Sequence, residues 1–197
     1  MEIKSVLFDL DGTITVPFLD FDLIREEMGI PADAASILEE LEAMPDTDRR
    51  KAMAILESHE DLAAERSTLN SGARETLTAL RNYRINIGIL TRNKHSNAVI
   101  VQQKHGLYFD AIYAREDGPV KPDAYGVMHL CGLFGCVPAE ALVVGDFVDD
   151  LICAKNAGAT AVLIKTHKNA DLYAEYADFT ISTLDKVLPI IENMASQ

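Results

Sequence analysis

The stretch "SVLFDLDGTITV", residues 5–16, joins an apolar run directly to two acidic residues. The run 6–8 is typical of a buried strand, and Asp9, Asp11 and Gly12 follow it without a neutral turn. Two carboxylates this close repel each other unless a cation holds them or they share a proton. Mg²⁺ takes oxygen ligands of this kind, and Gly12 allows a sharp turn that brings backbone N–H groups near an anion. The stretch favours such a site over a simple acidic turn that ends a strand.

A calcium loop is a further alternative for these spaced aspartates. It fits poorly, because glycine falls at the fourth position instead of the sixth and no glutamate closes the twelve-residue span.

The composition describes an acidic globular chain of 197 residues with a formal net charge of -13 and 48% hydrophobic residues. This length suits one domain, or one domain with a small insertion. The negative charge disfavours binding to nucleic acid or to an anionic membrane surface. No apolar run approaches the ~20 residues that span a membrane, and the start lacks the pattern of a signal peptide. Three cysteines without metal-ligand spacing indicate free thiols, so we expect a cytoplasmic protein.

Short apolar runs alternate with helical patterns along most of the chain. Runs of strand length are residues 3–7, 85–90, 141–144 and 161–164, with a weaker one at 111–113. Such continuous runs are typical of central strands that are covered on both faces. The alternation predicts an α/β fold with a doubly wound parallel sheet.

Residues 15–70 interrupt this alternation, because they contain no convincing strand and show helical patterns instead. Breaks are expected at residues 29–31, 44–45 and 58–59. We therefore expect a small, all-helical cap at 15–70 inserted into a core made of 1–14 and 71–197. Such a cap would cover the carboxyl edge of the sheet, where open α/β sheets bind ligands.

Three further polar sites follow predicted strands. Thr91 in "GILTRN" offers a hydroxyl for a phosphoryl oxygen, although threonine at a strand end is also ordinary. Lys121 in "GPVKPDAYG" is either a fixed cation or one of the many solvated lysines. In "ALVVGDFVDDLICAKNAG", Asp146 ends a strand and two more acids begin a helix. Helix capping explains one of these acids well and all three less well.

Taken together and in their order along the chain, the four stretches resemble the motifs of the haloacid dehalogenase (HAD) superfamily of phosphohydrolases. The motifs are "FDLDGT", "LT" at 90–91, "KPD" at 121–123 and "GDFVDD" at 145–150. The resemblance covers nearly the whole chain and implies a Rossmann-like core with a short helical cap. Within the superfamily, the chain looks most like phosphoglycolate phosphatases. Phe147 and Arg92 depart from that subgroup, where serine and asparagine are frequent, and the cap is shorter.

The resemblance also implies roles for individual residues. Asp9 would be the nucleophile and Asp11 the general acid and base. Thr91 would bind the phosphoryl oxygens, and Lys121 would orient the nucleophile. Asp146, Asp9 and the backbone carbonyl of Asp11 would bind Mg²⁺. Asp150 would support the metal site, and Asp149 is the alternative for this role. The residues expected to bind the substrate are Gly12, Thr13, Arg92 and Asn93.

The expected function is therefore a Mg²⁺-dependent phosphatase of small phosphorylated metabolites that forms an aspartyl-phosphate. Asp11 argues against the dehalogenase, phosphonatase and P-type ATPase branches, which lack an acid at this position. A phosphomutase similar to beta-phosphoglucomutase and a catalytically silent binding or regulatory protein remain as alternatives. No sequence feature indicates an oligomeric state.

Overall fold

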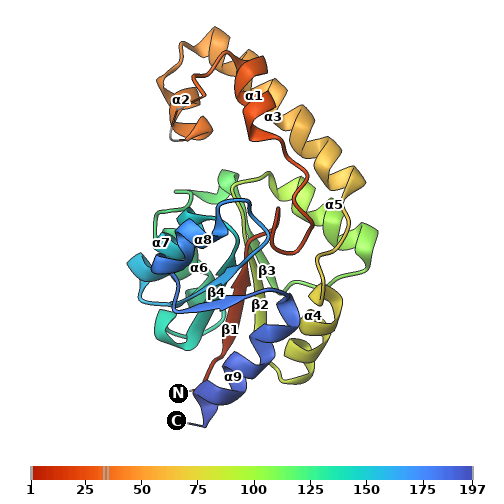
Figure 1. Ribbon diagram of the computed structural model, residues 1–197, viewed down its shortest axis with the longest axis vertical. Helices are drawn as coiled ribbons and strands as arrows, with labels where there is room; N and C mark the ends of the chain where they lie inside the picture. The colour runs from red at the N-terminus through yellow and green to blue at the C-terminus, as the bar shows by residue number, and fades with distance from the viewer. Residues whose placement is uncertain (1, 33, 35, 197) are drawn as a thin grey trace. The chain divides into compact units, whose positions relative to one another are not determined.

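The computed structural model describes residues 2–32, 34 and 36–196, which form two compact units (Figure 1). The core unit comprises the chain up to Pro17 together with the chain from Ser67 onward. The helical unit is the continuous stretch Phe18–Arg66. These boundaries fall inside the stretch 15–70 in which the sequence pattern changes.

The core unit is built on a six-stranded sheet in which every neighbouring pair of strands is parallel. The strand order is β3-β2-β1-β4-β5-β6, which confirms the predicted doubly wound α/β class. The strands are β1 (Ser5–Phe8), β2 (Asn86–Leu90), β3 (Ala111–Tyr113), β4 (Ala141–Gly145), β5 (Thr160–Ile164) and β6 (Phe179–Ile181).

Helices cover both faces of this sheet, as Figure 1 shows. One face carries α4 (Ala73–Asn82), α5 (His95–His105) and α9 (Val187–Ala195), and the other carries α6 (Tyr125–Leu133), α7 (Val148–Ala157) and α8 (Ala170–Tyr173). Because both faces are covered, side chains of the central strands are buried whichever way they point. Leu7 and Val143 pack in one apolar cluster with Leu130 of α6 and Leu151 of α7.

The helical unit consists of α1 (Phe21–Met28), α2 (Ile37–Ala43) and α3 (Asp46–Arg66) in its described residues. Asp20 caps the start of α1, and Gly29 ends it in the left-handed conformation with φ of 69°. Ile24, Leu41 and Leu56 bring the three helices together in a small apolar core.

One sequence expectation is wrong, and one strand was not predicted. The predicted break at residues 58–59 does not occur, because α3 continues through both residues, and neither serine nor histidine prevents a helix. The strand β6 was not predicted. It lies at the edge of the sheet with Phe179 and Thr180 exposed, so it lacks the continuous apolar run of a central strand.

The sheet order has a switch point at β1 and β4. These two strands are neighbours, and the chain proceeds from β1 toward β2 on one side and from β4 toward β5 on the other. Such a switch point leaves room between the loops that follow the two strands. The pairing continues one residue past β1, where the backbone N–H of Asp9 donates to the carbonyl oxygen of Val144 at 2.9 Å.

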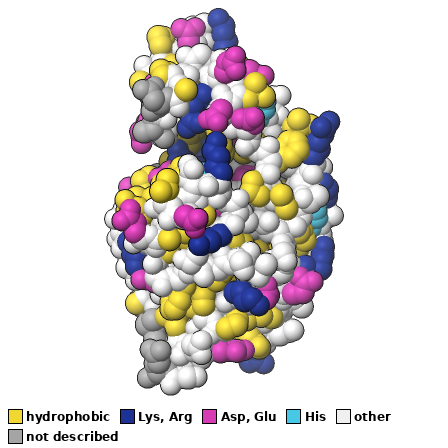
Figure 2. Space-filling view, in the orientation of Figure 1, with side chains coloured by type: hydrophobic (Ala, Val, Ile, Leu, Met, Phe, Trp, Pro, Cys, Tyr) yellow, Lys and Arg dark blue, Asp and Glu magenta, His cyan; other side chains and the backbone are white. Residues whose placement is uncertain are grey.

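Charged side chains of both signs are mixed on the face of the molecule in Figure 2. In the part of the chain that the structure describes, no helix combines the length and the apolar character needed to cross a membrane. All three cysteines are free thiols, and Cys131 and Cys153 are buried.

The buried cluster predicts a clear difference between two leucines of α6. Leu130 is fully buried, whereas Leu133 is 63% exposed. Leu130→Ala should lower the free energy of unfolding by about 2–5 kcal/mol, because it leaves a cavity in the core. Leu133→Ala should change it by less than about 0.5 kcal/mol. Urea unfolding of both variants checks the difference, and equal effects would contradict the assigned packing.

Candidate active site

Lys121 is buried between the carboxylates of Asp9, which follows β1, and Asp150. It lies in the loop between β3 and α6 and is 4% exposed. Its Nζ atom donates to Oδ1 of Asp9 and to Oδ1 of Asp150, each at 2.6 Å. The ammonium group therefore joins the end of β1 to the first turn of α7.

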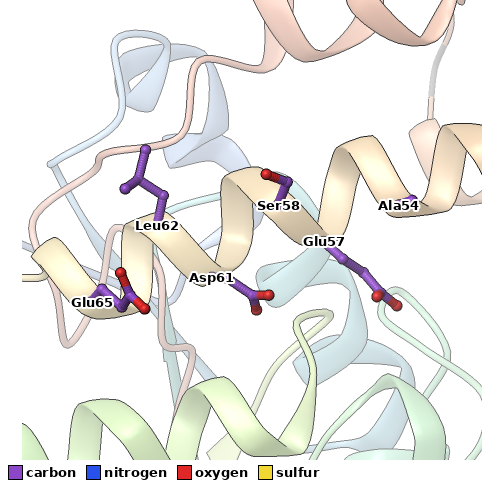
Figure 3. Close-up of a pocket in the computed structure, with 6 residues that line it drawn as sticks. All are labelled: Ala54, Glu57, Ser58, Asp61, Leu62 and Glu65. Carbon is purple, nitrogen blue, oxygen red and sulfur yellow. The ribbon is translucent and has the colours of Figure 1, made fainter.

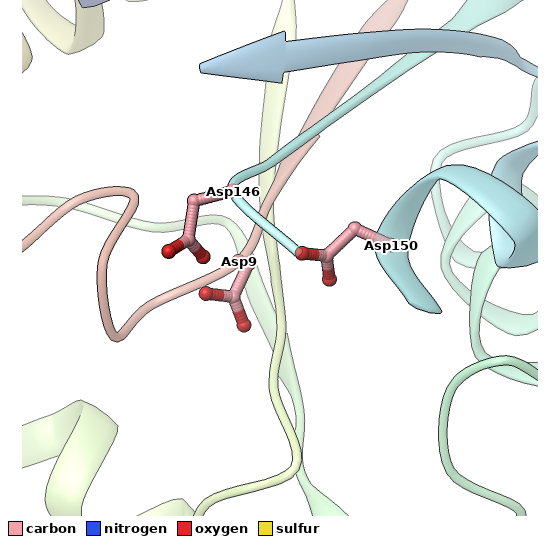
Figure 4. A group of neighbouring side chains, drawn as sticks. All are labelled: Asp9, Asp146 and Asp150. Carbon is pink, nitrogen blue, oxygen red and sulfur yellow. The ribbon is translucent and has the colours of Figure 1, made fainter. Parts of the chain in front are cut away.

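Asp9, Asp146 and Asp150 form an acidic cluster at the same place (Figure 4). Asp9 follows β1, Asp146 follows β4, and Asp150 lies in the first turn of α7. Each residue offers one carboxylate oxygen, and these oxygens lie within 4.8 Å of one another. The structure thus brings together three acids that are far apart in the sequence.

Two glycines allow this close approach. A Cβ atom at Gly12, where φ is 90°, would lie 2.3 Å from Oδ2 of Asp146. A Cβ atom at Gly145 would lie 2.2 Å from the side chain of Asp150. Larger residues at either position would displace a carboxylate of the cluster. Sequence reasoning missed Gly145 as a site residue, although it stands directly before Asp146 in the "GD" motif.

The side chain of Asp11 is hydrogen-bonded to a residue outside the acidic cluster. Its Oδ2 atom accepts a hydrogen bond from Nδ2 of Asn93 at 2.9 Å. The backbone N–H of Asn93 in turn donates to Oγ1 of Thr91 at 3.0 Å. The loop after β2 therefore connects Thr91, Asn93 and Asp11, three residues that the sequence analysis had selected separately.

The structure separates Asp149 from Asp150, which the sequence does not. Asp149 forms an ion pair with Arg92. Asp150 faces Lys121, and its Oδ2 atom accepts from the backbone N–H of Phe147 at 3.1 Å. Asp150 is therefore the acid of this pair that belongs to the cluster.

Asn70 holds the loop that contains Gly12 and Thr13. Its Nδ2 atom lies 2.9 Å from the carbonyl oxygens of Gly12, Thr13 and Thr15. The hydroxyl of Thr166 also donates to the carbonyl oxygen of Gly12, at 2.6 Å. Thr13 is fully buried, and its Oγ1 atom has no hydrogen-bond partner among the described residues. Asn70 and Thr166 were missed because nothing local in the sequence relates them to this loop.

Burial and mutual repulsion raise the pKa values of the clustered acids. The pKa of Asp9 rises to about 7, mainly through burial, with Asp150 adding to the rise and Lys121 opposing it. Burial, followed by the charges of Asp9 and Asp150, raises the pKa of Asp146 to about 8. Burial also raises the pKa of Asp11, against the hydrogen bond from Asn93. Burial alone would lower the pKa of Lys121, but the carboxylates of Asp150 and Asp9 raise it above its ordinary value.

These residues fit a hard divalent cation such as Mg²⁺. The three acids of the cluster present carboxylate oxygens, and the buried ammonium of Lys121 contacts two of them, Asp9 and Asp150. Burial, together with the neighbouring carboxylates, raises the pKa values of Asp9 and Asp146, and Lys121 offsets only part of the negative charge, so a deficit of positive charge remains. A carboxylate-rich site with this charge deficit matches the oxygen preference of Mg²⁺.

A separate pocket lies along one side of α3 in the helical unit (Figure 3). Its volume is about 440 Å³, and its lining combines acidic residues with small or apolar ones. The lining residues are Ala54, Glu57, Ser58, Asp61, Leu62 and Glu65. Their spacing of three or four residues places them on one face of the helix. The described lining contains no cation, whereas the Asp9 site is built around the ammonium group of Lys121.

The acidic cluster predicts that Mg²⁺ stabilises the protein more at about pH 8 than at about pH 5. Asp9 and Asp146 ionise near pH 3.8 when unfolded but at about 7 and about 8 when folded. The folded state therefore binds more protons across this window, and stability in EDTA falls as the pH rises through it. A cation binds the ionised cluster, so it restores stability where the acids have lost their protons.

Thermal unfolding with Mg²⁺ and with EDTA measures this effect. At a hundredfold excess over Kd, binding contributes about 2.7 kcal/mol, a shift of roughly 5–11 °C for a chain of this size. Asp146→Asn is the control and should reduce both the Mg²⁺ shift and its dependence on pH. A shift that is equal at both pH values, or unchanged in Asp146→Asn, would contradict the metal assignment.

Comparison with known proteins gives consistent matches along the chain. The model of the haloacid dehalogenase-like hydrolase family matches residues 22–164. A haloacid dehalogenase-like hydrolase domain-containing protein of Arabidopsis thaliana is 30% identical over 206 residues, covering 96% of this chain and 84% of that protein. A phosphoglycolate phosphatase of Chromobacterium violaceum is 26% identical over 217 residues, covering 97% of each chain.

The solved structures agree with this result. The crystal structure of an HAD phosphatase from Thermococcus onnurineus has a TM-score of 0.69 and 27% identity, and the match covers 96% of this chain and 98% of that one. The resemblance predicted from the four sequence motifs is therefore confirmed, including the likeness to phosphoglycolate phosphatases. The chain belongs to the haloacid dehalogenase-like hydrolase family.

Proposed function

We propose that this protein is a Mg²⁺-dependent phosphatase that hydrolyses small phosphorylated metabolites through an aspartyl-phosphate. One observation carries the proposal: Asp9 is fixed by Lys121 beside an acidic cluster, while Asp11, two residues away, has its own separate partner. A nucleophile and a general acid in different surroundings are what two-step phosphoryl transfer requires. The names of the related phosphatases support the same reaction class.

Asp9 is the proposed nucleophile. Its Oδ1 atom accepts from Lys121, which holds the carboxylate in place and offsets part of its negative charge. In the first step, an oxygen of Asp9 forms a bond to phosphorus as the bond from phosphorus to the leaving oxygen breaks. In the second step, water attacks the same phosphorus, and the carboxylate of Asp9 is released.

Asp11 is the proposed general acid and base. Because Oδ2 accepts from Asn93, the proton is assigned to Oδ1. That proton passes to the leaving oxygen in the first step, so the alcohol departs neutral. The carboxylate of Asp11 then takes a proton from the attacking water in the second step.

Asp9, Asp146 and the backbone carbonyl of Asp11 are the proposed ligands of Mg²⁺, with Asp150 supporting them. When bound, the ion supplies positive charge beside the phosphoryl oxygens. Asp150 accepts from both Lys121 and the backbone N–H of Phe147, so its oxygens are already engaged by the protein. We therefore assign Asp150 to positioning Lys121 and shaping the cluster.

The phosphoryl oxygens are proposed to bind at the hydroxyl of Thr91 and the backbone N–H groups near Gly12. Thr91 is fixed by the hydrogen bond from Asn93, and its hydroxyl retains a proton to donate. Thr13 is a further candidate because its buried hydroxyl has no partner among the described residues. Arg92 and Asn93 bind carboxylates of the protein, so their proposed contribution is to order this loop around the substrate.

The helical unit is proposed to act as a cap that selects the leaving group. The chain leaves the core unit after Pro17, shortly beyond Asp11, and re-enters it at Ser67. There the N–H of Val16 donates to Thr68, and the N–H of Asn70 donates to Ile14, each at 2.9 Å. The two crossings are thus tied to the loop that carries the proposed acid.

Three free thiols support a reducing compartment such as the cytoplasm.

Phosphate release from a panel of sugar phosphates, phosphoglycolate and nucleotides tests the function, with Mg²⁺ or with EDTA. Wild type should release phosphate with Mg²⁺ and not with EDTA. Asp9→Asn should lower the rate by more than about 10³-fold, because it removes the nucleophile. A melting temperature close to that of wild type shows that the variant is folded.

Equal results for wild type and Asp9→Asn on every compound would contradict the proposal. A requirement for a bisphosphate activator would indicate the phosphomutase instead. Binding of a phosphorylated compound without turnover would indicate the regulatory protein.

A further inference from the structure

Asn97 is a fully buried polar residue whose side chain donates a hydrogen bond to Asn93 of the proposed site. It lies in the first turn of α5, and its side chain is 0% exposed. Its Nδ2 atom donates to Oδ1 of Asn93 at 3.0 Å. Asn93 then donates to Asp11, so the three side chains form a short chain of hydrogen bonds.

The two donors that meet Oδ1 of Asn93 determine which way its amide group faces. One is Nδ2 of Asn97, and the other is the backbone N–H of Lys94 at 2.7 Å. A backbone N–H only donates, so this side of the amide must be the oxygen. The NH₂ group is therefore left facing Oδ2 of Asp11. A reversed amide would place two donors together and an oxygen against a carboxylate.

Asn97 lowers the stability of the folded state compared with an apolar residue at this position, if its role is only to fill the core. Its Oδ1 atom is buried and has no hydrogen-bond partner among the described residues. A buried acceptor without a partner destabilises the folded state, whereas an apolar side chain of similar size does not. The hydrogen bond to Asn93 is thus the one polar contact of this side chain that the structure records.

We propose that Asn97 is a positioning residue for Asp11 and acts through Asn93. The inference rests on the proposed role of Asp11 as general acid. Asn97 touches no reacting atom. It holds the oxygen of Asn93, and Asn93 holds Oδ2 of Asp11, which leaves Oδ1 directed to the leaving oxygen.

Loss of the hydrogen bonds that connect Asn97, Asn93 and Asp11 should affect protonation of the leaving oxygen more than the other chemical steps. Without Asn97, the amide of Asn93 keeps a single donor on its oxygen, and Asp11 is held less firmly. Alkyl phosphates need a proton on the leaving oxygen, because an alkoxide is a poor leaving group. p-Nitrophenyl phosphate needs none, because p-nitrophenolate departs readily. The ratio of the two reactions therefore reports the position of Asp11.

The test compares kcat/KM of Asn97→Leu on p-nitrophenyl phosphate and on the alkyl phosphate that wild type hydrolyses best. In the variant, kcat/KM should fall by about tenfold on the alkyl phosphate, a loss typical of residues that orient a functional group without touching the ligand. On p-nitrophenyl phosphate it should fall by less than about twofold. Its melting temperature should equal or exceed that of wild type. Asp11→Asn should show the same selectivity more strongly.

Thr76→Val is the matched control. Thr76 is also fully buried, lies in α4 outside the site, and has an Oγ1 atom without a partner among the described residues. This variant should leave both substrates unchanged.

Equal loss on both substrates in Asn97→Leu, or no loss on the alkyl phosphate, would overturn the proposal while the phosphatase function stands. If Asn97→Leu does not fold, Asn97→Ala removes the same donor and is judged by the same ratio. No selectivity in Asp11→Asn would overturn the acid role and this inference with it. Wild type without phosphatase activity would overturn the proposed function itself.

Discussion

The buried contact of Lys121 with Asp9 and Asp150 is the interaction on which the site depends. It joins three segments, the end of β1, the loop after β3 and the first turn of α7, through two hydrogen bonds of 2.6 Å. Burying these charges is unfavourable for each alone, and removing one partner of such a contact typically costs about 3–5 kcal/mol. The carboxylate of the proposed nucleophile Asp9 and that of Asp150 in α7 are therefore held by the same ammonium group.

The sheet order explains why these segments meet. Neighbouring strands β1 and β4 both end in an aspartate, and parallel strands present their carboxyl ends at one edge. Gly12 and Gly145 then remove the side chains that would separate the acids. Burial of these acids raises the pKa values of Asp9 and Asp146, and the repulsion between the close carboxylates adds to the rise.

Much of this arrangement is predictable from the sequence, because its cause is local. The runs before Asp9 and Asp146 are apolar and short, so they predict buried strands whose ends lie together. The edge strand β6 escapes this reasoning because two of its three residues are exposed. Asp149 and Asp150 are equivalent in sequence, and only the direction of each side chain separates them. Asn70 donates to backbone carbonyl oxygens that are distant in the sequence, so no local pattern relates it to their loop. Asn97 bonds to Asn93 one helical turn away, but no sequence motif distinguishes this asparagine from others.

The central claim is that Asp9 attacks phosphorus, and trapping the aspartyl-phosphate tests it most directly. The enzyme is quenched in acid during turnover with Mg²⁺ and substrate, reduced with borohydride, and analysed by peptide mass spectrometry. Borohydride converts an acyl phosphate to an alcohol, so position 9 should carry homoserine, and omission of Mg²⁺ should abolish it. Homoserine at a different aspartate, or rapid turnover without any reduced aspartate, would contradict the claim.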